Sequence, residues 1–209
     1  MSISRCAALF ILRRPGKYTI YGSAVYVGQN HILTAAHNFP VEDDGAERQI
    51  LVTVPGLSVI GLRDLDKNKI QMTECELLST GFRKGAKRDF PRDMAILKTK
   101  GFISGCEPQL SRQEVVVGLI VDVVGFPASF SDEWVKEHSA IANVEKGVES
   151  ARKMLPARRL ISSRGTIEEI KGGLMYYKLS TCPGMSGGLI RAGNKIIGII
   201  ILQRKSNRR

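Results

Sequence analysis

Short apolar segments with strand-like alternation, divided by glycine-containing turns, occupy most of this chain. In the first half they cover residues 7–14, 18–28, 31–37, 48–56, 69–79 and 93–100. In the second half they cover residues 114–127, 158–180 and 194–203. Short strands at such close spacing, with turn signals between them, are typical of antiparallel sandwiches and barrels. The pattern therefore predicts an all-β protein.

One segment, residues 131–155, departs from the strand pattern. Its apolar residues recur at helical spacing, and Ser131 stands at a suitable N-cap position ahead of two acidic residues. Gly147 weakens the helix at mid-length. We expect an amphipathic helix inserted in the second half of the chain. Its apolar face is more commonly used for core packing than for binding a partner.

The length of the chain fits one large β domain or two small barrels. It has 209 residues, of which 43% are hydrophobic and 24% charged, as is ordinary for a globular protein with a buried core. A stretch with glycine and proline at 101–108 separates the two β-rich halves. We expect an N-terminal barrel over 1–104 and a C-terminal barrel over 105–209 that includes the 131–155 insertion.

The formal net charge of +11 allows contact with polyanions. The basic residues are spread along the sequence, and aromatic residues make up only 6% of it. A nucleic-acid-binding pattern with interleaved aromatics is absent. Nucleic-acid binding stays open on charge alone, and a solvated basic surface is the commoner explanation.

Metal sites and membrane spans find little support in the sequence. The four cysteines include no CxxC pair and the three histidines complete no ligand set, so we expect no metal and no other cofactor. The apolar run at 6–12 is short for a signal peptide and lacks a cleavage site, and no segment approaches the length of a membrane span. Four unpaired thiols would fit an intracellular protein (cytoplasm, or host cytoplasm for a virus), with secretion left open.

The segment TCPGMSGGLI, residues 181–190, places one serine, Ser186, among three glycines. A simple turn needs fewer glycines, so Gly184, Gly187 and Gly188 indicate unusual backbone dihedrals or the close approach of another group. A serine hydroxyl is a weak nucleophile until a base takes its proton, and histidine suits that role because its pKa lies near neutrality. The segment is a candidate catalytic site if such a base exists elsewhere.

Several histidines and aspartates compete for the roles of base and orienting acid. His31 follows a turn signal and His138 falls in the helical segment, whereas His37 ends the segment NHILTAAH beside small residues that pack tightly. Asp93 directly precedes an apolar run, where an unsatisfied acid is costly. Its alternative role is a surface acid paired with a basic neighbour. Asp89 lies among basic residues and is interpreted as part of a loop.

Three segments follow one another in the order His, Asp, Ser: GSAVYVGQNHILTAAH, RDMAIL and CPGMSGGLI. They resemble the signature segments of chymotrypsin-like (trypsin-fold, PA clan) serine peptidases over nearly the whole chain. The resemblance implies two six-stranded antiparallel Greek-key barrels with the active site between them. It implies His37 as general base, Asp93 as orienting carboxylate and Ser186 as nucleophile. The backbone amides of Gly184 and Ser186 would form the oxyanion hole.

Departures from the digestive enzymes place the resemblance nearer to the glutamyl-endopeptidase-like and viral branch. Met185 stands where the digestive enzymes carry the aspartate that receives a new N-terminus, and no cysteine follows His37. By resemblance, the primary substrate pocket is lined by Ser180, Thr181, Ile200, Ile201 and Leu202. These residues predict an apolar pocket, although Arg204 or Lys205 could reach in and favour an acidic side chain.

The sequence therefore predicts a serine endopeptidase that cleaves polypeptides through an acyl-enzyme intermediate without metal or cofactor. The alternative from another class is a catalytically silent module of the same fold that binds RNA or acidic proteins through its basic surface. A further alternative keeps the fold and acts on esters or transfers acyl groups. The natural substrate and the oligomeric state are not predicted.

Overall fold

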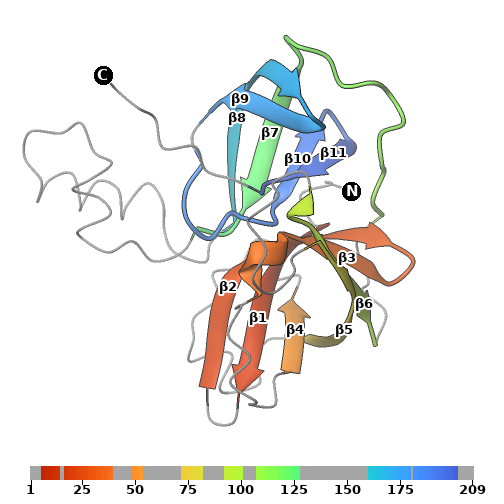
Figure 1. The fold of residues 1–209 in the computed structure, drawn as a ribbon, viewed down its shortest axis with the longest axis vertical. Coiled ribbons are helices and arrows are strands. Elements are labelled where there is room, and N and C mark those ends of the chain that lie inside the picture. The colour runs from red at the N-terminus through yellow and green to blue at the C-terminus, as the bar shows by residue number, and fades with distance from the viewer. Residues whose placement is uncertain are drawn as a thin grey trace, which may run out of the picture.

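A computed structural model describes residues 6–14, 17–39, 49–53, 72–81, 92–100, 107–127, 160–179 and 181–201. These residues form two antiparallel β-sheets, one above the other in Figure 1. The prediction of an all-β fold is confirmed, and η2 (Ala36–Asn38) is a single 3₁₀ turn. The helix predicted over 131–155 lies outside the described residues. No helix among the described residues is long and apolar enough to cross a membrane.

The first sheet is a closed barrel of six strands. The strands are β1 (Ala7–Arg14), β2 (Lys17–Gly28), β3 (His31–Thr34), β4 (Gln49–Thr53), β5 (Thr73–Thr80) and β6 (Ala95–Thr99). Their spatial order is β1-β2-β3-β6-β5-β4, and β4 closes the barrel against β1. The fourth strand therefore returns beside the first, which is the Greek-key connection. This sheet has the six strands that the sequence predicts for the N-terminal barrel.

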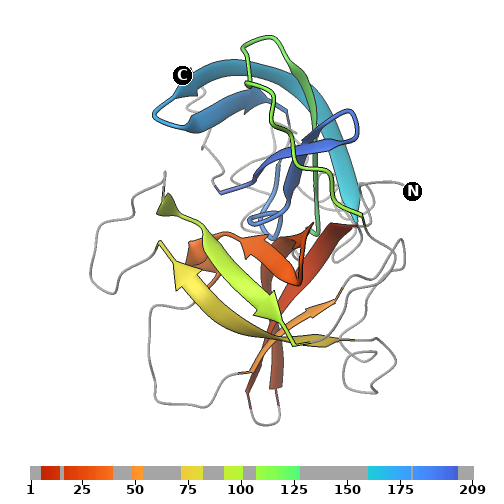
Figure 2. The ribbon, with the colours of Figure 1, turned by 90° about the vertical axis from the view of Figure 1, so that its right-hand side faces the viewer.

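The second sheet repeats the Greek-key order with five strands among the described residues. They are β7 (Ile120–Gly125), β8 (Ile161–Lys171), β9 (Leu174–Lys178), β10 (Leu189–Ala192) and β11 (Lys195–Ile199). Their order is β11-β10-β7-β8-β9, so β10 lies beside β7 as β4 lies beside β1. Figure 2 shows how strongly β8 curves in this sheet. The described part of the chain ends two residues after β11, so the six strands expected here are corrected to five for that part.

The apolar segment at 114–119 is not a strand, although the sequence predicts one over 114–127. Gly118 has a φ of +86° and turns the chain just ahead of β7. Val116 and Val117 are 53% and 60% exposed, so their side chains contribute little to the core. The prediction was wrong here because a short apolar run reads alike whether it is buried in a sheet or exposed in a loop.

The larger of two hydrophobic clusters joins the two sheets. It packs Val25, Ile32 and Leu97 of the barrel together with Val124 and Leu189 of the second sheet. The second cluster lies within the second sheet. Its buried members are Val121, Val123, Ile167, Cys182, Met185, Ile190 and Ile200. The apolar surface that the two sheets bury against each other holds the sheets together. It thereby also fixes the loops at their junction.

The cysteines differ from the expectation of four unpaired thiols. Cys75 and Cys182 are free and buried, whereas Cys6 is disulfide-bonded. Cys106 lies outside the described residues. The expectation was wrong for Cys6 because sequence spacing does not show which distant cysteines meet. The intracellular location stays a prediction. Burial raises the pKa of both free thiols to about 12.

Candidate active site

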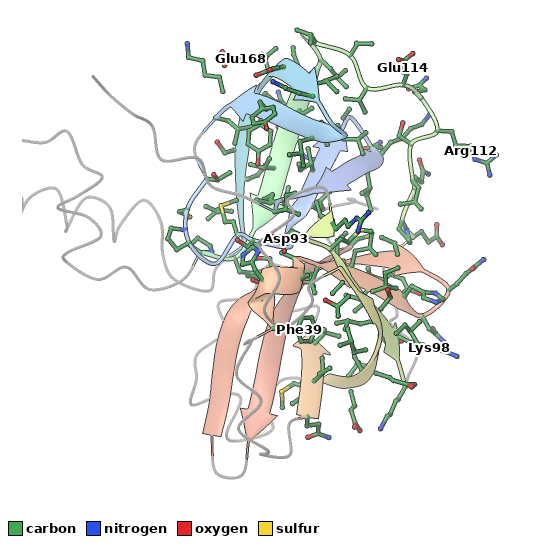
Figure 3. The ribbon with its side chains drawn as sticks, in the orientation of Figure 1. Phe39, Asp93, Lys98, Arg112, Glu114 and Glu168 are labelled. Carbon is green, nitrogen blue, oxygen red and sulfur yellow. The ribbon has the colours of Figure 1, made fainter. Side chains whose placement is uncertain are left out.

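The pairing of β3 with β6 brings His37 and Asp93 together. Thr34, the last residue of β3, lies opposite Ala95, the first residue of β6. His37 follows Thr34 by three residues, in η2, and Asp93 precedes Ala95 by two. Both residues therefore leave the barrel at the same end of one strand pair. Figure 3 shows Asp93 at the junction between the two sheets.

The carboxylate of Asp93 holds His37 at two points. The backbone N–H of His37 donates to Oδ1 at 2.8 Å, and the ring Nδ1 lies 2.8 Å from Oδ2. The side chain of Asp93 is fully buried, while that of His37 is 25% exposed. An ionised carboxylate only accepts hydrogen bonds, so the ring proton sits on Nδ1 and Nε2 carries the basic lone pair. The pair can therefore act as a base and its orienting acid.

Ser186 lies beside this pair, on the loop that precedes β10. Its carbonyl oxygen accepts hydrogen bonds from the backbone N–H of Ser23 at 2.8 Å and from the side-chain amide of Asn38 at 3.0 Å. Asn38 directly follows His37, so these bonds fix the serine loop next to the histidine. Among the described residues the Ser186 hydroxyl makes no hydrogen bond to His37. Without substrate such catalytic hydrogen bonds are often long, and they tighten when substrate binds.

The backbone amides around Ser186 alternate between bonded and unbonded. The amide of Met185 donates to the carbonyl of Cys182 at 3.1 Å, and the amide of Gly187 donates to a carbonyl just after β11 at 2.6 Å. The amides of Gly184 and Ser186 find no acceptor within the described part of the chain. Two unused donors in an otherwise bonded loop suit an oxyanion hole, whose donors must be in place before negative charge develops.

The glycines of this loop are needed for conformation and for space. Gly184 and Gly187 have φ values of +90° and +85°, in the region that side chains rarely adopt. A methyl group on Gly187 would overlap the carbonyl oxygen of Ser23 and the hydroxyl of Thr34. A methyl group on Gly188 would lie 2.5 Å from a β7 carbonyl oxygen. The sequence prediction of unusual dihedrals and close approach is confirmed at these positions.

Sequence reasoning missed a buried polar network between the barrel and the serine loop. Ser23, Thr34 and Asn38 are 0%, 0% and 3% exposed. The Asn38 amide donates to Thr34 Oγ1 at 3.0 Å, and that hydroxyl donates to the carbonyl of Ser23 at 2.7 Å. A Cβ on Gly22 would lie 2.5 Å from the Asn38 amide nitrogen, so this glycine makes room for the network. Its signal in the sequence is the polar residues that interrupt the apolar segments GSAVYV and ILTAAHN.

A cavity of about 400 Å³ lies beside the second sheet and reaches Asp93 of the candidate catalytic pair. Asp93 and Met94 line it from the first barrel. Most of the remaining wall is apolar. It includes Leu174, Met175, Leu179, Ile190, Ile197, Ile199 and Ile201. No lysine, arginine or histidine is present in the described part of this wall. An acidic side chain entering the cavity would therefore meet no described cation.

The predicted pocket residues fall in different places. Thr181 and Ile201 line the cavity. Ile200 is 3% exposed and belongs to the core of the second sheet. Ser180 and Leu202 lie outside the described residues.

Tyr177 brings a polar group to this cavity, and sequence reasoning did not single it out. Its hydroxyl makes no hydrogen bond among the described residues. Burial raises the pKa of Tyr177 to about 12, so the hydroxyl is neutral and can donate. The acidic Glu168 also lines the cavity. Among the described residues, no three His, Cys, Asp or Glu side chains group closely enough to hold a metal ion.

No protein-family model matches this chain, and no curated protein matches its sequence. Among solved structures it is similar to the HtrA-type protease AlgW, in a structure described with a decapeptide. The TM-score is 0.58 at 18% sequence identity, and the match covers 97% of this chain. The chain spans 57% of the AlgW chain. This likeness shows that the protein has the fold of trypsin-like serine proteases. The glutamyl-endopeptidase-like and viral branch stays a prediction.

Proposed function

We propose that this protein is a serine endopeptidase. The proposal rests on three structural features that lie together at the junction of the two sheets. They are the histidine held by the Asp93 carboxylate, the loop of Ser186 fixed beside it, and two backbone amides without acceptors. Each feature has a role in acyl transfer, and the trypsin-like fold agrees with that chemistry.

In this mechanism His37 Nε2 takes the hydroxyl proton of Ser186 while Oγ bonds to the carbonyl carbon of the substrate. Asp93 stays ionised and stabilises the imidazolium that forms. The amides of Gly184 and Ser186 bind the carbonyl oxygen as it becomes negatively charged. The carbon–nitrogen bond then breaks, and the proton on His37 passes to the leaving amine. Water attacks the resulting ester with His37 as base, which releases the new carboxyl end and restores the serine.

The substrate class proposed is a polypeptide with an apolar side chain at the residue that is cleaved. The support is the cavity of about 400 Å³, whose described wall is mostly apolar and includes no basic residue. Such a volume accommodates a large aliphatic or aromatic side chain. The similar structure is that of a protease and is described with a decapeptide, which agrees with a polypeptide substrate.

A cleavage assay with a matched variant tests the proposal. We expect the wild type to cut a mixture of unstructured peptides, as seen by mass spectrometry, and Ser186→Ala with an unchanged melting temperature to cut none. Equal cleavage by both proteins would contradict the proposal. Peptide substrates compared with esters of the same sequence would identify an enzyme that acts on esters alone.

The alternative, a silent module that binds RNA or acidic proteins, has the net charge of +11 as its support. Binding of a labelled RNA oligomer separates it from the peptidase, because polyanion binding would survive Ser186→Ala whereas hydrolysis would not. A folded wild type that binds RNA tightly and cleaves no peptide would favour the alternative.

A further inference from the structure

We propose that Ser23 is a positioning residue that sets the two oxyanion-binding amides from across the junction of the sheets. This inference rests on the proposed function. Ser23 lies in β2, within the first barrel, whereas the amides it would position belong to the loop before β10. It is fully buried and contacts no reacting atom in the mechanism above. Its action would pass through the backbone of residues 184–186.

The hydroxyl of Ser23 has one possible direction for its proton. The backbone N–H of Phe126 donates to Ser23 Oγ at 2.8 Å. The Ser23 hydroxyl must then donate in turn, and the carbonyl oxygen of Gly184 lies 2.8 Å from it. One side chain thus connects the end of β7 with the serine loop; the bond from Phe126 is buried and the bond to Gly184 is partly buried. In this low-dielectric surrounding they are stronger than equivalent bonds in water.

Ser23 also holds the serine loop through its main chain. Its backbone N–H donates to the carbonyl oxygen of Ser186 at 2.8 Å. The two residues whose amides lack acceptors, Gly184 and Ser186, are therefore the same two whose carbonyl groups Ser23 fixes. A single residue in the barrel therefore restrains the backbone on the C-terminal side of each donor.

The hydroxyl bond matters most at Gly184. This residue has a φ of +90° and no Cβ, so steric restriction on its backbone is small. Ser186, in contrast, keeps its hydrogen bonds from the Ser23 main chain and from Asn38 whatever side chain stands at position 23. Removal of the Ser23 hydroxyl would release the backbone at Gly184 and leave the backbone at Ser186 held.

The side chain of Ser23 has little freedom to move elsewhere. A Cβ on Gly125 would already lie 3.1 Å from Ser23 Oγ, so the neighbouring strand closes around the hydroxyl. The Ser23 carbonyl is in turn held by the hydroxyl of Thr34 at 2.7 Å. The geometry is that of a preorganised support, whose bonds exist before substrate binds.

Binding of two peptide ligands to Ser23→Ala tests this role. The first is a peptide boronic acid, whose boron takes Ser186 Oγ as a fourth ligand while the proton passes to His37, so that one boronate oxygen occupies the oxyanion site. The second is the same peptide as an amide, which needs no oxyanion site. We expect the preference of Ser23→Ala for the boronate over the amide to fall by about 10- to 100-fold from the wild-type value. The affinity of Ser23→Ala for the amide ligand should change little.

Thr99→Val is the matched control. Thr99 is 3% exposed, and its hydroxyl donates to the carbonyl of Asn30 at 3.3 Å, at the end of β6 away from Ala95 and the site. This variant tests loss of a buried barrel hydroxyl that does not hold the serine loop, and we expect its boronate preference to change less than about threefold. Unfolding midpoints of both variants show whether each is folded under the assay conditions.

The outcomes separate this inference from the proposed function. A wild type that prefers the boronate, together with a Ser23→Ala protein that prefers it equally, would overturn the positioning role alone. Equal losses of boronate preference in Ser23→Ala and Thr99→Val would also overturn it, because the effect would then follow from loss of any buried hydroxyl in the barrel. A folded wild type with no preference for the boronate would remove the proposed function, and the positioning role with it.

Discussion

Gly187→Ala, compared with Gly118→Ala, measures how closely the serine loop is pressed against the barrel. The two glycines have nearly the same φ, +85° and +86°, so a Cβ at either position meets a similar backbone penalty. Around Gly118 nothing lies within 4 Å of the new methyl group. Around Gly187 the methyl group would overlap the carbonyl oxygen of Ser23 and the hydroxyl of Thr34.

The magnitudes follow from these two environments. A side chain in the left-handed region costs about 1–2 kcal/mol, which is the whole loss of unfolding free energy that we expect for Gly118→Ala. Gly187→Ala carries that cost and about 1–3 kcal/mol more, because a strand carbonyl and a buried hydroxyl must shift to admit the methyl group. We expect a total of about 2–5 kcal/mol.

Denaturant unfolding followed by circular dichroism gives both free energies, and fluorophosphonate labelling of the folded proteins gives the effect on the site. Gly118→Ala should label at the wild-type rate, while Gly187→Ala should label much more slowly because Ser23 and the loop are displaced together. If the two variants lose the same unfolding free energy within about 0.5 kcal/mol and are labelled at the same rate, the close approach at Gly187 is refuted.

Four further outcomes follow from the structure. Asp93→Asn should lower the rate of fluorophosphonate labelling by about four orders of magnitude at pH 7, because the amide no longer fixes the Nδ1-protonated ring; a loss below tenfold would contradict its role. Arg164 and Arg191 hold the pKa of Asp122 below its usual range. The contribution of Asp122 to the unfolding free energy is therefore present above about pH 4 and is lost as the pH falls through the lowered pKa. Asp122→Asn should therefore cost about 1–3 kcal/mol at pH 7 and less as the pH falls through the lowered pKa, and a cost that does not fall in acid would count against this. Tyr177→Phe should leave the unfolding free energy unchanged or raised, since its hydroxyl has no described partner; a loss above about 1 kcal/mol would show a missed hydrogen bond. Dithiothreitol should lower the unfolding midpoint, because Cys6 is disulfide-bonded, and an unchanged midpoint would show that the bond adds no stability.

The fold was accessible from the sequence where local rules decide it. Alternation of apolar residues and glycine turns marks the strands of the barrel, and the Gln29-Asn30 turn between β2 and β3 has the positive φ values that tight hairpins require. Alternation failed at Val116 and Val117, where an apolar run is exposed. Alternation also gave no indication of β10. This strand is only four residues long and directly follows the glycine-rich segment around Ser186, which is interpreted as a catalytic motif.

The candidate site was only partly accessible. His37 and Asp93 meet because two neighbouring strands end together, and a motif in the right order indicates such a meeting. The supporting contacts join residues far apart in sequence, such as the Ser23 hydroxyl and the Gly184 carbonyl, 161 positions away. Neither periodicity nor composition encodes which buried hydroxyl meets which carbonyl, so this layer required the structure.

Intact mass after incubation with a fluorophosphonate tests the central claim most directly. The claim is that Ser186 is made nucleophilic by His37 in a site with preformed oxyanion donors. It predicts a single covalent adduct on the wild type, placed on Ser186 by peptide mapping, and no adduct on folded Ser186→Ala or His37→Ala. A folded wild type that stays unlabelled, or an adduct that persists in Ser186→Ala, would contradict it.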